Sequence, residues 1–210
     1  MIKNNQSHFS ANFYNTKYYL NHDRWFSYYQ QLKKIHQIKP KKILEVGIGN
    51  GFLKRMLADE FIIKTFDCNP KLKPDILGDI RQIKLDRNSF DLVCCFQVLE
   101  HLPFNQLKIC LQELHRVSNK YVLISLPYAR IDLKLEFKLP LLGFYRFFST
   151  IPRFYQKHQF DGQHYWEIGK KGFTLKTIKQ ILELYFTIEK IDNYYDNPYH
   201  IFFKLKKNYD

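Results

Sequence analysis

Short apolar runs alternate with amphipathic segments along the first 130 residues of the chain. The runs at 43–46, 61–67 and 92–96 are rich in Ile, Val, Leu and Phe. Continuous apolar runs of this length are typical of strands buried on both faces of a sheet. Segments of helical period lie at 52–58 and 105–114. The order of strands and helices predicts a mostly parallel sheet covered on both faces.

The remaining segments complete this pattern, with one exception. Residues 9–38 place aromatic and aliphatic side chains at helical spacings, and a helix is expected to begin near Thr174. Further strands are predicted at 75–80 and 121–126, and two more, joined by a polar turn, at 186–191 and 200–205. Asn105 is the predicted N-cap of the helix at 105–114. The exception is 129–168, where basic and apolar residues alternate irregularly.

Length and composition favour one folded domain. The chain has 210 residues, of which 45% are hydrophobic, so we do not expect it to be disordered. Lys and Arg exceed Asp and Glu by 13, which favours an anionic partner such as RNA, a phosphorylated small molecule or a membrane surface, although a solvated basic surface explains the excess equally well. The four cysteines form no Cys-x-x-Cys pair. We therefore expect free thiols and no metal site.

Targeting signals are not evident in the sequence. Residues 1–10 are polar, which predicts no signal peptide, and the apolar stretch at 139–148 is too short and too interrupted to span a bilayer. These features predict a cytoplasmic protein without a transmembrane segment.

Three glycines at alternate positions, Gly47, Gly49 and Gly51, stand between the first strand and the following helix. Glycines at such a turn let a ligand approach the backbone closely. A dinucleotide-binding turn would have its third glycine at Phe52. Asp67 ends the next strand twenty residues after Gly47, which is the spacing at which nucleotide-binding folds place a carboxylate on the ribose hydroxyls. The turn Asn69-Pro70 that follows offers a purely structural alternative for this acid.

Two sequence motifs carry a family resemblance. Glu45 opens a Glu-x-Gly-x-Gly-x-Gly pattern, and a Ser-Phe-Asp turn at 89–91 leads through an apolar strand to Val-Leu-Glu-His-Leu at 98–102. Together they resemble class I S-adenosylmethionine-dependent methyltransferases, in particular the type 11 group. The resemblance implies an α/β Rossmann-like fold, with a mostly parallel seven-stranded sheet, an antiparallel C-terminal hairpin and helices on both faces. It divides a single domain into a helical cap at 1–39, a cofactor-binding core at 40–128, a lid insertion at 129–168, and a C-terminal helix and hairpin at 169–210.

The resemblance also implies a cofactor, S-adenosyl-L-methionine, and the residues that bind it. Asp79 matches the acid that accepts from the adenine amino group, and Ile80 matches the residue that packs on the ring. Arg24, in the cap, is suited to the carboxylate of the cofactor, although an exposed arginine without a role is an equal alternative. The predicted cofactor-binding residues are Arg24, Glu45, Gly47, Ile48, Gly49, Gly51, Asp67, Cys68, Asp79, Ile80 and Gln97.

Two histidines are candidates for the base that a hydroxyl acceptor requires. His101 follows the fourth predicted strand, and His164 lies in the predicted lid beside Glu167, which could orient it. A loop-shaping role for His101 and an anchoring role for His164 remain alternatives. The predicted substrate-binding residues are Tyr128, Trp166 and Glu167.

The nature of the acceptor depends on weaker signals. The Asn-Pro-Pro-Tyr or Asp-Pro-Pro-Tyr motif typical of methylation at base nitrogens is missing after the fourth strand, and the similar Asn-Pro-Tyr at 197–199 is predicted to lie far from the site. The stretch at 161–169 is similar to one in bacterial methyltransferases of surface-saccharide pathways. We therefore predict a small-molecule acceptor, anionic or saccharide, methylated on oxygen. An RNA methyltransferase and a protein that binds a membrane surface or a partner through the basic insertion are the alternatives.

Overall fold

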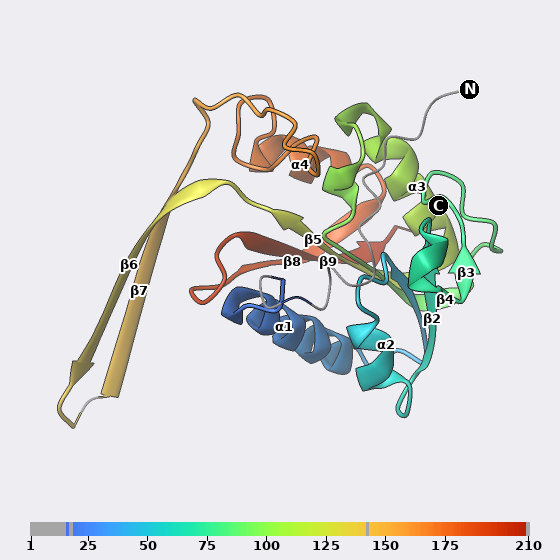
Figure 1. Cartoon of the computed structure of the whole chain (residues 1–210), viewed down its shortest axis with the longest axis horizontal. Coiled ribbons are helices and arrows are strands. Elements are labelled where there is room, and N and C mark those ends of the chain that lie inside the picture. Colours follow the sequence, from blue (N-terminus) through green and yellow to red (C-terminus); the bar gives the residue numbers. More distant parts are fainter. Residues whose placement is uncertain (1–15, 17–18, 142, 209–210) are drawn as a thin grey trace.

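A seven-stranded, mostly parallel sheet forms the centre of the molecule (Figure 1). The structure is a computed structural model and describes residues 16, 19–141 and 143–208. The predicted fold class is confirmed, with strand order β3-β2-β1-β4-β5-β9-β8. The strands, in chain order, are β1 Lys42–Val46, β2 Ile62–Asp67, β3 Ile76–Leu77, β4 Phe90–Phe96, β5 Ser118–Pro127, β8 Phe186–Asn193 and β9 His200–Lys207. A separate two-stranded sheet is made of β6 Arg130–Leu139 and β7 Gly143–Pro152.

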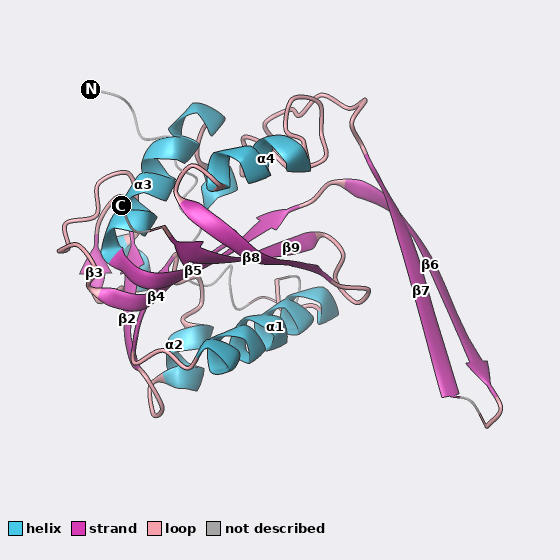
Figure 2. Cartoon of the chain, turned by 180° about the vertical axis from the view of Figure 1, so that it is seen from behind, coloured by secondary structure: helices cyan, strands magenta, loops and turns pink. Residues whose placement is uncertain are grey.

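Helices cover both faces of the large sheet (Figures 1 and 2). Helices α1 His22–Ile38 and α2 Phe52–Leu57 pack on one face, and α3 Leu107–Val117 and α4 Leu175–Leu182 pack on the other. Successive side chains of a strand point to opposite faces. Thus Cys94 of β4 belongs to the buried cluster beneath α1 and α2, whereas Cys95 belongs to the larger cluster beneath α3 and α4. All four cysteines are free thiols, as expected.

The prediction that a helix begins near Thr174 is confirmed, and α1 has a comparable side-chain cap that the sequence analysis did not identify. Asn21 caps α1 by accepting from the Arg24 N–H, and Thr174 caps α4 by accepting from the Thr177 N–H at 3.0 Å. The prediction that Asn105 caps α3 is wrong. Asn105 lies inside a 3₁₀ turn, Phe104–Gln106, and the helix begins after it without a side-chain cap.

The last strand, β9, lies between β5 and β8 and runs antiparallel to both. An antiparallel strand begins at the sheet edge where its parallel neighbour ends. Pro127, at the end of β5, is therefore paired with His200, at the start of β9. This arrangement brings the C-terminal hairpin to the functional edge of the sheet.

The insertion at 129–168 does not behave as one lid. Its first part, β6 and β7, forms a long hairpin that projects from the body, and we call residues 130–152 the arm (Figures 1 and 2). Only the second part returns to the carboxyl edge of the sheet. The two strands of the arm pair only with each other, so the arm is a sheet separate from the large one. Within the described part of the chain, no helix is long and apolar enough to span a bilayer.

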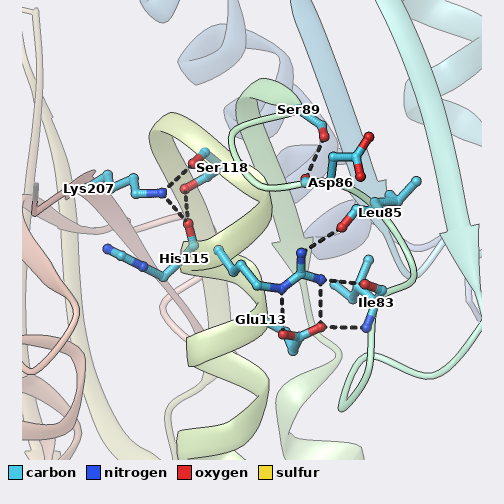
Figure 3. A network of polar contacts seen from close by, with 9 residues as sticks. Ile83, Leu85, Asp86, Ser89, Glu113, His115, Ser118 and Lys207 are labelled. Atoms are coloured by element: carbon cyan, nitrogen blue, oxygen red, sulfur yellow. Dashed lines mark hydrogen bonds and ion pairs between the residues drawn. The ribbon is translucent and has the colours of Figure 1, made fainter.

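Polar contacts fix α3 to the loop that precedes β4 (Figure 3). Glu113 accepts from the Ile83 N–H at 2.6 Å and from the Arg116 Nε at 2.8 Å. Arg116 in turn donates to the Leu85 carbonyl at 2.6 Å and to the Ile83 carbonyl. The pKa of Glu113 is held below its usual value, chiefly by the hydrogen bonds from Arg116. The loop backbone thus depends on two side chains of one helix turn.

Replacing Glu113 with Ala should lower the free energy of unfolding by about 1–3 kcal/mol, because the Ile83 N–H and the Arg116 guanidinium would lose an acceptor. Urea denaturation measures the change. Lys108→Ala, at an exposed position of α3, is the matched control and should be close to neutral. Equal stability of the two variants would show that this clamp does not hold the loop.

Candidate functional site

A cavity of about 310 Å³ lies at the carboxyl edge of the sheet, where β1, β2 and β4 end. Open α/β sheets bind their ligands at this edge. The cavity is lined by the glycine turn after β1, the acid that ends β2, the loop after β4, and parts of α1, of the insertion and of β9. It therefore joins most of the residues that the sequence motifs indicated.

The turn after β1 is shaped by positive backbone φ angles. Gly47 has φ +84° and Gly49 has φ +54°, a region that side-chain-bearing residues rarely adopt. A Cβ on Gly47 would also overlap the side chain of Val98, which follows β4. Glycine is thus required at position 47 for two reasons, its positive φ angle and the close packing of this turn against Val98. Gly51, at φ +71°, precedes α2 and does not line the cavity.

Asp67 is held in place by the backbone on both of its oxygens. Oδ2 accepts from the Ile48 N–H at 3.0 Å, and Oδ1 accepts from the Asn69 N–H at 2.8 Å. A carboxylate oxygen has further lone pairs, so both oxygens can still accept from a ligand hydroxyl. Cys68 lines the cavity beside it, and burial together with Asp67 raises the pKa of its thiol to about 11. The thiol is therefore neutral near pH 7 and suits contact with an uncharged ring.

Glu45 contributes a buried carboxyl group to the cavity wall. Its side chain is on β1, and Oε2 has no hydrogen-bond partner among the described residues. Burial, and secondarily the charge of Asp67, raises the pKa of Glu45 well above its usual value. A buried polar atom without a partner is costly, and a donor from a bound ligand would remove that cost.

Asp79 and Ile80 line the cavity after β3. Asp79 is already engaged by Arg81, whose Nε lies 2.9 Å from Oδ1 and 3.0 Å from Oδ2. This pairing holds the pKa of Asp79 below its usual value. Ile80 is buried and supplies an apolar surface. The carboxylate is thus ionised and oriented, and it shares its oxygens with Arg81.

Helix α1 closes another side of the cavity with Arg24 and Tyr28. The Arg24 guanidinium lies 4.5 Å from the centre of the Tyr19 ring and forms no ion pair among the described residues. Tyr28 stacks on Phe52 with ring centres 4.3 Å apart and donates to the Asn50 Oδ1. A cation at this position suits an anionic group of a ligand. The part of the predicted cap at 1–15 and 17–18 lies outside the described residues.

Two histidines stand together in the cavity wall, on loops far apart in sequence. The rings of His101 and His164 are 5.1 Å apart at their centres, at an angle of 66°. The Nδ1 of His101 lies 2.9 Å from the Gln163 carbonyl, and the Nδ1 of His164 lies 3.0 Å from the Glu167 Oε1. Both Nδ1 atoms face oxygen atoms, and neither Nε2 has a hydrogen bond to another described residue, so each Nε2 can contact a ligand.

The two histidines differ in their protonation. Burial lowers the pKa of His101 to about 4, so this ring is neutral near pH 7. Burial alone would also lower the pKa of His164, but the hydrogen bond to Glu167 and the nearby Glu100 raise it overall. His164 is therefore the stronger base of the pair.

Glu167 is the centre of a small polar network. Burial opposes its ionisation, but donors from His164, Lys170 and Tyr199 hold its pKa at about 2. The Tyr199 hydroxyl donates at 2.6 Å, and the Lys170 Nζ lies at 2.8 Å. Glu167 thus acts as an ionised orienting group behind His164 and does not itself line the cavity.

The loop after β4 adds a second buried acid, Glu100, beneath the histidines. It is fully buried, and burial raises its pKa to about 7. Gln97, whose φ is +55°, stands between Glu100 and β5. With its amide oriented to satisfy its neighbours, Gln97 donates to the Glu100 Oε1 at 3.2 Å and accepts from the Leu126 N–H at 3.1 Å. Gln97 thereby fixes the loop as well as lining the cavity.

Tyr199 and His200 line the cavity, contrary to the prediction that the Asn-Pro-Tyr segment lies far from it. The reason is the antiparallel direction of β9, which begins at the edge where β5 ends. His200 is buried, its Nδ1 lies 2.8 Å from the Ser27 Oγ, and burial lowers its pKa well below the usual value. The antiparallel hairpin that the sequence predicted was the signal that could have identified both residues.

Trp166 and Tyr128 do not reach the cavity. Trp166 is fully buried in the core and donates its Nε1 hydrogen to the Leu102 carbonyl at 3.1 Å. Tyr128 is also buried, with the Arg130 guanidinium 4.7 Å from its ring centre. The predicted substrate contacts of these two aromatic residues are therefore corrected to structural roles. Phe160, Gln163 and Tyr165 of the insertion line the cavity instead.

Comparison with known protein families gives a match to the part of the chain that contains the glycine turn, Asp67 and the loop after β4. Residues 44–121 match the family model described as a methyltransferase domain. Among curated proteins, none matches the chain.

Solved structures are similar over nearly the whole chain. A S-adenosylmethionine-dependent methyltransferase from Clostridium acetobutylicum has a TM-score of 0.62 at 12% identity, with 95% of this chain and 98% of that chain covered. The N-methyltransferase NodS from Bradyrhizobium japonicum, in complex with S-adenosyl-L-homocysteine, has a TM-score of 0.61 at 13% identity and covers 90% of both chains. A 1,6-didemethyltoxoflavin-N1-methyltransferase from Burkholderia thailandensis has a TM-score of 0.56 at 12% identity, with 85% of this chain and 76% of that chain covered. At these identities the likeness is one of fold.

The His164–Glu167 pair predicts a measurable proton affinity. In NMR titrations the His164 ring should have a pKa above the ordinary 6.5, and Glu167→Gln should lower it, because burial then acts without the compensating carboxylate. The resonance is assigned by its loss in His164→Ala. Glu183→Gln, at an exposed position, is the control and should leave the pKa unchanged. An equal pKa in wild type and Glu167→Gln would contradict the pairing.

Proposed function

Because the chain is a class I S-adenosylmethionine-dependent methyltransferase of the type 11-like group, we propose that it methylates a small hydroxylated molecule, on oxygen. The observation that carries this proposal is His164, which lines the same cavity as Asp67 and is hydrogen-bonded to Glu167 behind it. A hydroxyl acceptor must lose its proton during transfer, and a histidine oriented by a carboxylate is suited to remove it.

The residues around the glycine turn fit the cofactor. We infer that Asp67 accepts from its ribose hydroxyls, that Ile80 and Cys68 pack on its adenine, and that Asp79 accepts from the adenine amino group. The turn at 47–49 has glycine at 47 and 49, so no side chain of either residue stands between its backbone and a ligand. Glu45 and Arg24 suit its amino and carboxylate groups. Among the described residues, the buried Glu45 Oε2 has no hydrogen-bond partner and Arg24 forms no ion pair. When bound, the cofactor supplies an electrophilic methyl group.

The chain itself has to position the acceptor and manage its proton. We infer that the Nε2 of His164 takes the proton, while Glu167 holds the ring and stabilises its charged form. His101, which is neutral, accepts a hydrogen bond from the acceptor and orients it. Tyr199, Gln163 and Tyr165 add polar and aromatic surface of the kind that suits a sugar or another hydroxylated metabolite.

Two features favour a small acceptor over RNA. The histidines share the lining of one cavity with Phe160, Gln163 and Tyr165 of the insertion. The basic residues are scattered, without one dense cluster. The neighbours from Bradyrhizobium and Burkholderia are described as N-methyltransferases. Oxygen is proposed here because of the base beside the cavity.

The cofactor assignment predicts a specific loss of binding. Asp67→Ala should weaken binding of S-adenosylhomocysteine by about 10–100-fold, because hydrogen bonds from the ribose to a charged group are lost. Isothermal titration calorimetry measures the affinity. Asp59→Ala, an exposed acid at the end of α2, is the control. Because Asp67 also binds the turn backbone, Asp67→Asn provides a second variant with less disturbance. Unchanged affinity in both variants would remove the ribose role.

The acceptor class is tested with methyl-labelled S-adenosylmethionine and separate panels of nucleotide sugars, sugar phosphates, phenols and total RNA. We expect label in a small hydroxylated compound, with mass spectrometry placing the methyl group on oxygen. His164→Ala should then reduce kcat by about 10²–10⁴-fold while S-adenosylhomocysteine still binds. Label found only in ribonuclease-sensitive material, or full turnover by His164→Ala, would overturn the corresponding part of the proposal.

A further inference from the structure

The arm is amphipathic along its whole length. In β6 the residues alternate between apolar and charged, so one face of the hairpin is apolar. The cross-strand pairs Leu135–Phe147 and Phe137–Tyr145 lie on this face. Its large side chains, all exposed, are Ile131, Leu133, Leu135, Phe137, Leu139, Tyr145, Phe147 and Ile151. Contiguous exposed apolar surfaces of this kind mark interaction sites.

The arm is oriented with this apolar face away from the body. Its opposite face contacts the turn between β8 and β9, where the Arg146 Nη1 lies 3.3 Å from the Asp196 Oδ1. Lys134 and Arg146 also lie over the Tyr195 ring, at 5.2 and 5.3 Å. The side chains on the outer face keep much of their surface exposed, from 39% at Leu139 to 60% at Leu133. No described residue of the body therefore covers the apolar face.

The residues at and near the tip of the arm indicate which kind of partner covers the apolar face. Leu141 is fully exposed at the tip, and Phe144 is 65% exposed. From 137 to 160 the sequence contains no acid. Its cations are Lys138, Arg153, Lys157 and Arg146, of which Arg146 pairs with Glu136 and Asp196. Aromatic and aliphatic side chains flanked by cations are suited to the interface of a bilayer that contains anionic lipids.

The net positive charge of the chain favours one of the possible binding partners of the apolar face. A second copy of the chain would bring two bodies with a net charge of +13 each against one another, and they would repel. An anionic bilayer surface attracts the same charge and takes up the apolar face. We propose that the arm docks this methyltransferase on an anionic membrane surface, with the tip and the outward apolar face in the lipid interface.

The test is co-sedimentation of the full chain with vesicles of phosphatidylcholine alone and of phosphatidylcholine mixed with phosphatidylglycerol. Wild type should bind the mixed vesicles, more weakly as salt is added, and the neutral vesicles far less. Leu135→Ser with Phe147→Ser should reduce binding at least about tenfold, because apolar area that enters the interface is lost. Lys138→Gln should reduce it about fivefold on mixed vesicles only.

The matched control is Ile62→Ser with Leu184→Ser, two side chains of the body that are 63% and 60% exposed. It should bind vesicles as wild type does. Calorimetry with S-adenosylhomocysteine shows that each variant is folded, because the arm does not line the cavity. Failure to bind mixed vesicles overturns the proposal. So does a dimer, seen by analytical ultracentrifugation, that dissociates in the arm variant while vesicles are ignored, because the apolar face then contacts a second copy.

Discussion

The side chain of Val98 occupies the space in which a Cβ on residue 47 would lie, and the cavity depends on this close approach. It joins the turn after β1 to the loop after β4, and the same turn binds Asp67 through the Ile48 N–H. Strands β1, β2 and β4 are parallel, and β1 pairs with both of the others, so their carboxyl ends meet at one edge of the sheet. A small displacement of the turn after any one of them would therefore move the other two. Glycine at position 47 is therefore required for the geometry of the part of the cavity that lies between the ends of β1, β2 and β4.

The other end of the cavity is organised by buried charge. Glu167 stays ionised in a buried position because His164, Lys170 and Tyr199 all donate to it. Such a network is stabilising only while every member is satisfied, so it also fixes the loop that carries His164. Function and local order thus depend on the same hydrogen bonds. The raised proton affinity of His164 is a consequence of this arrangement and not of exposure to solvent.

The arm is stabilised by different interactions from those of the body. Its strands bond only to each other, and a two-stranded sheet is marginal when isolated. Cation–ring contacts with Tyr195 and an ion pair with Asp196 hold one face to the β8–β9 turn. This attachment leaves the apolar face turned outward and separates it from the cavity.

Local sequence determined most of the fold. The apolar runs, the alternating glycines and Asp67 predicted the strands, the turn and the cofactor end, because short-range periodicity and spacing reflect backbone geometry directly. The same signals could not place Tyr199 and His200 in the cavity or Trp166 in the core. Those positions follow from which strand lies beside β5 and in which direction it runs. Strand direction and order are decided by packing between distant segments, and the orientation of the arm likewise depends on contacts with a turn some fifty residues away.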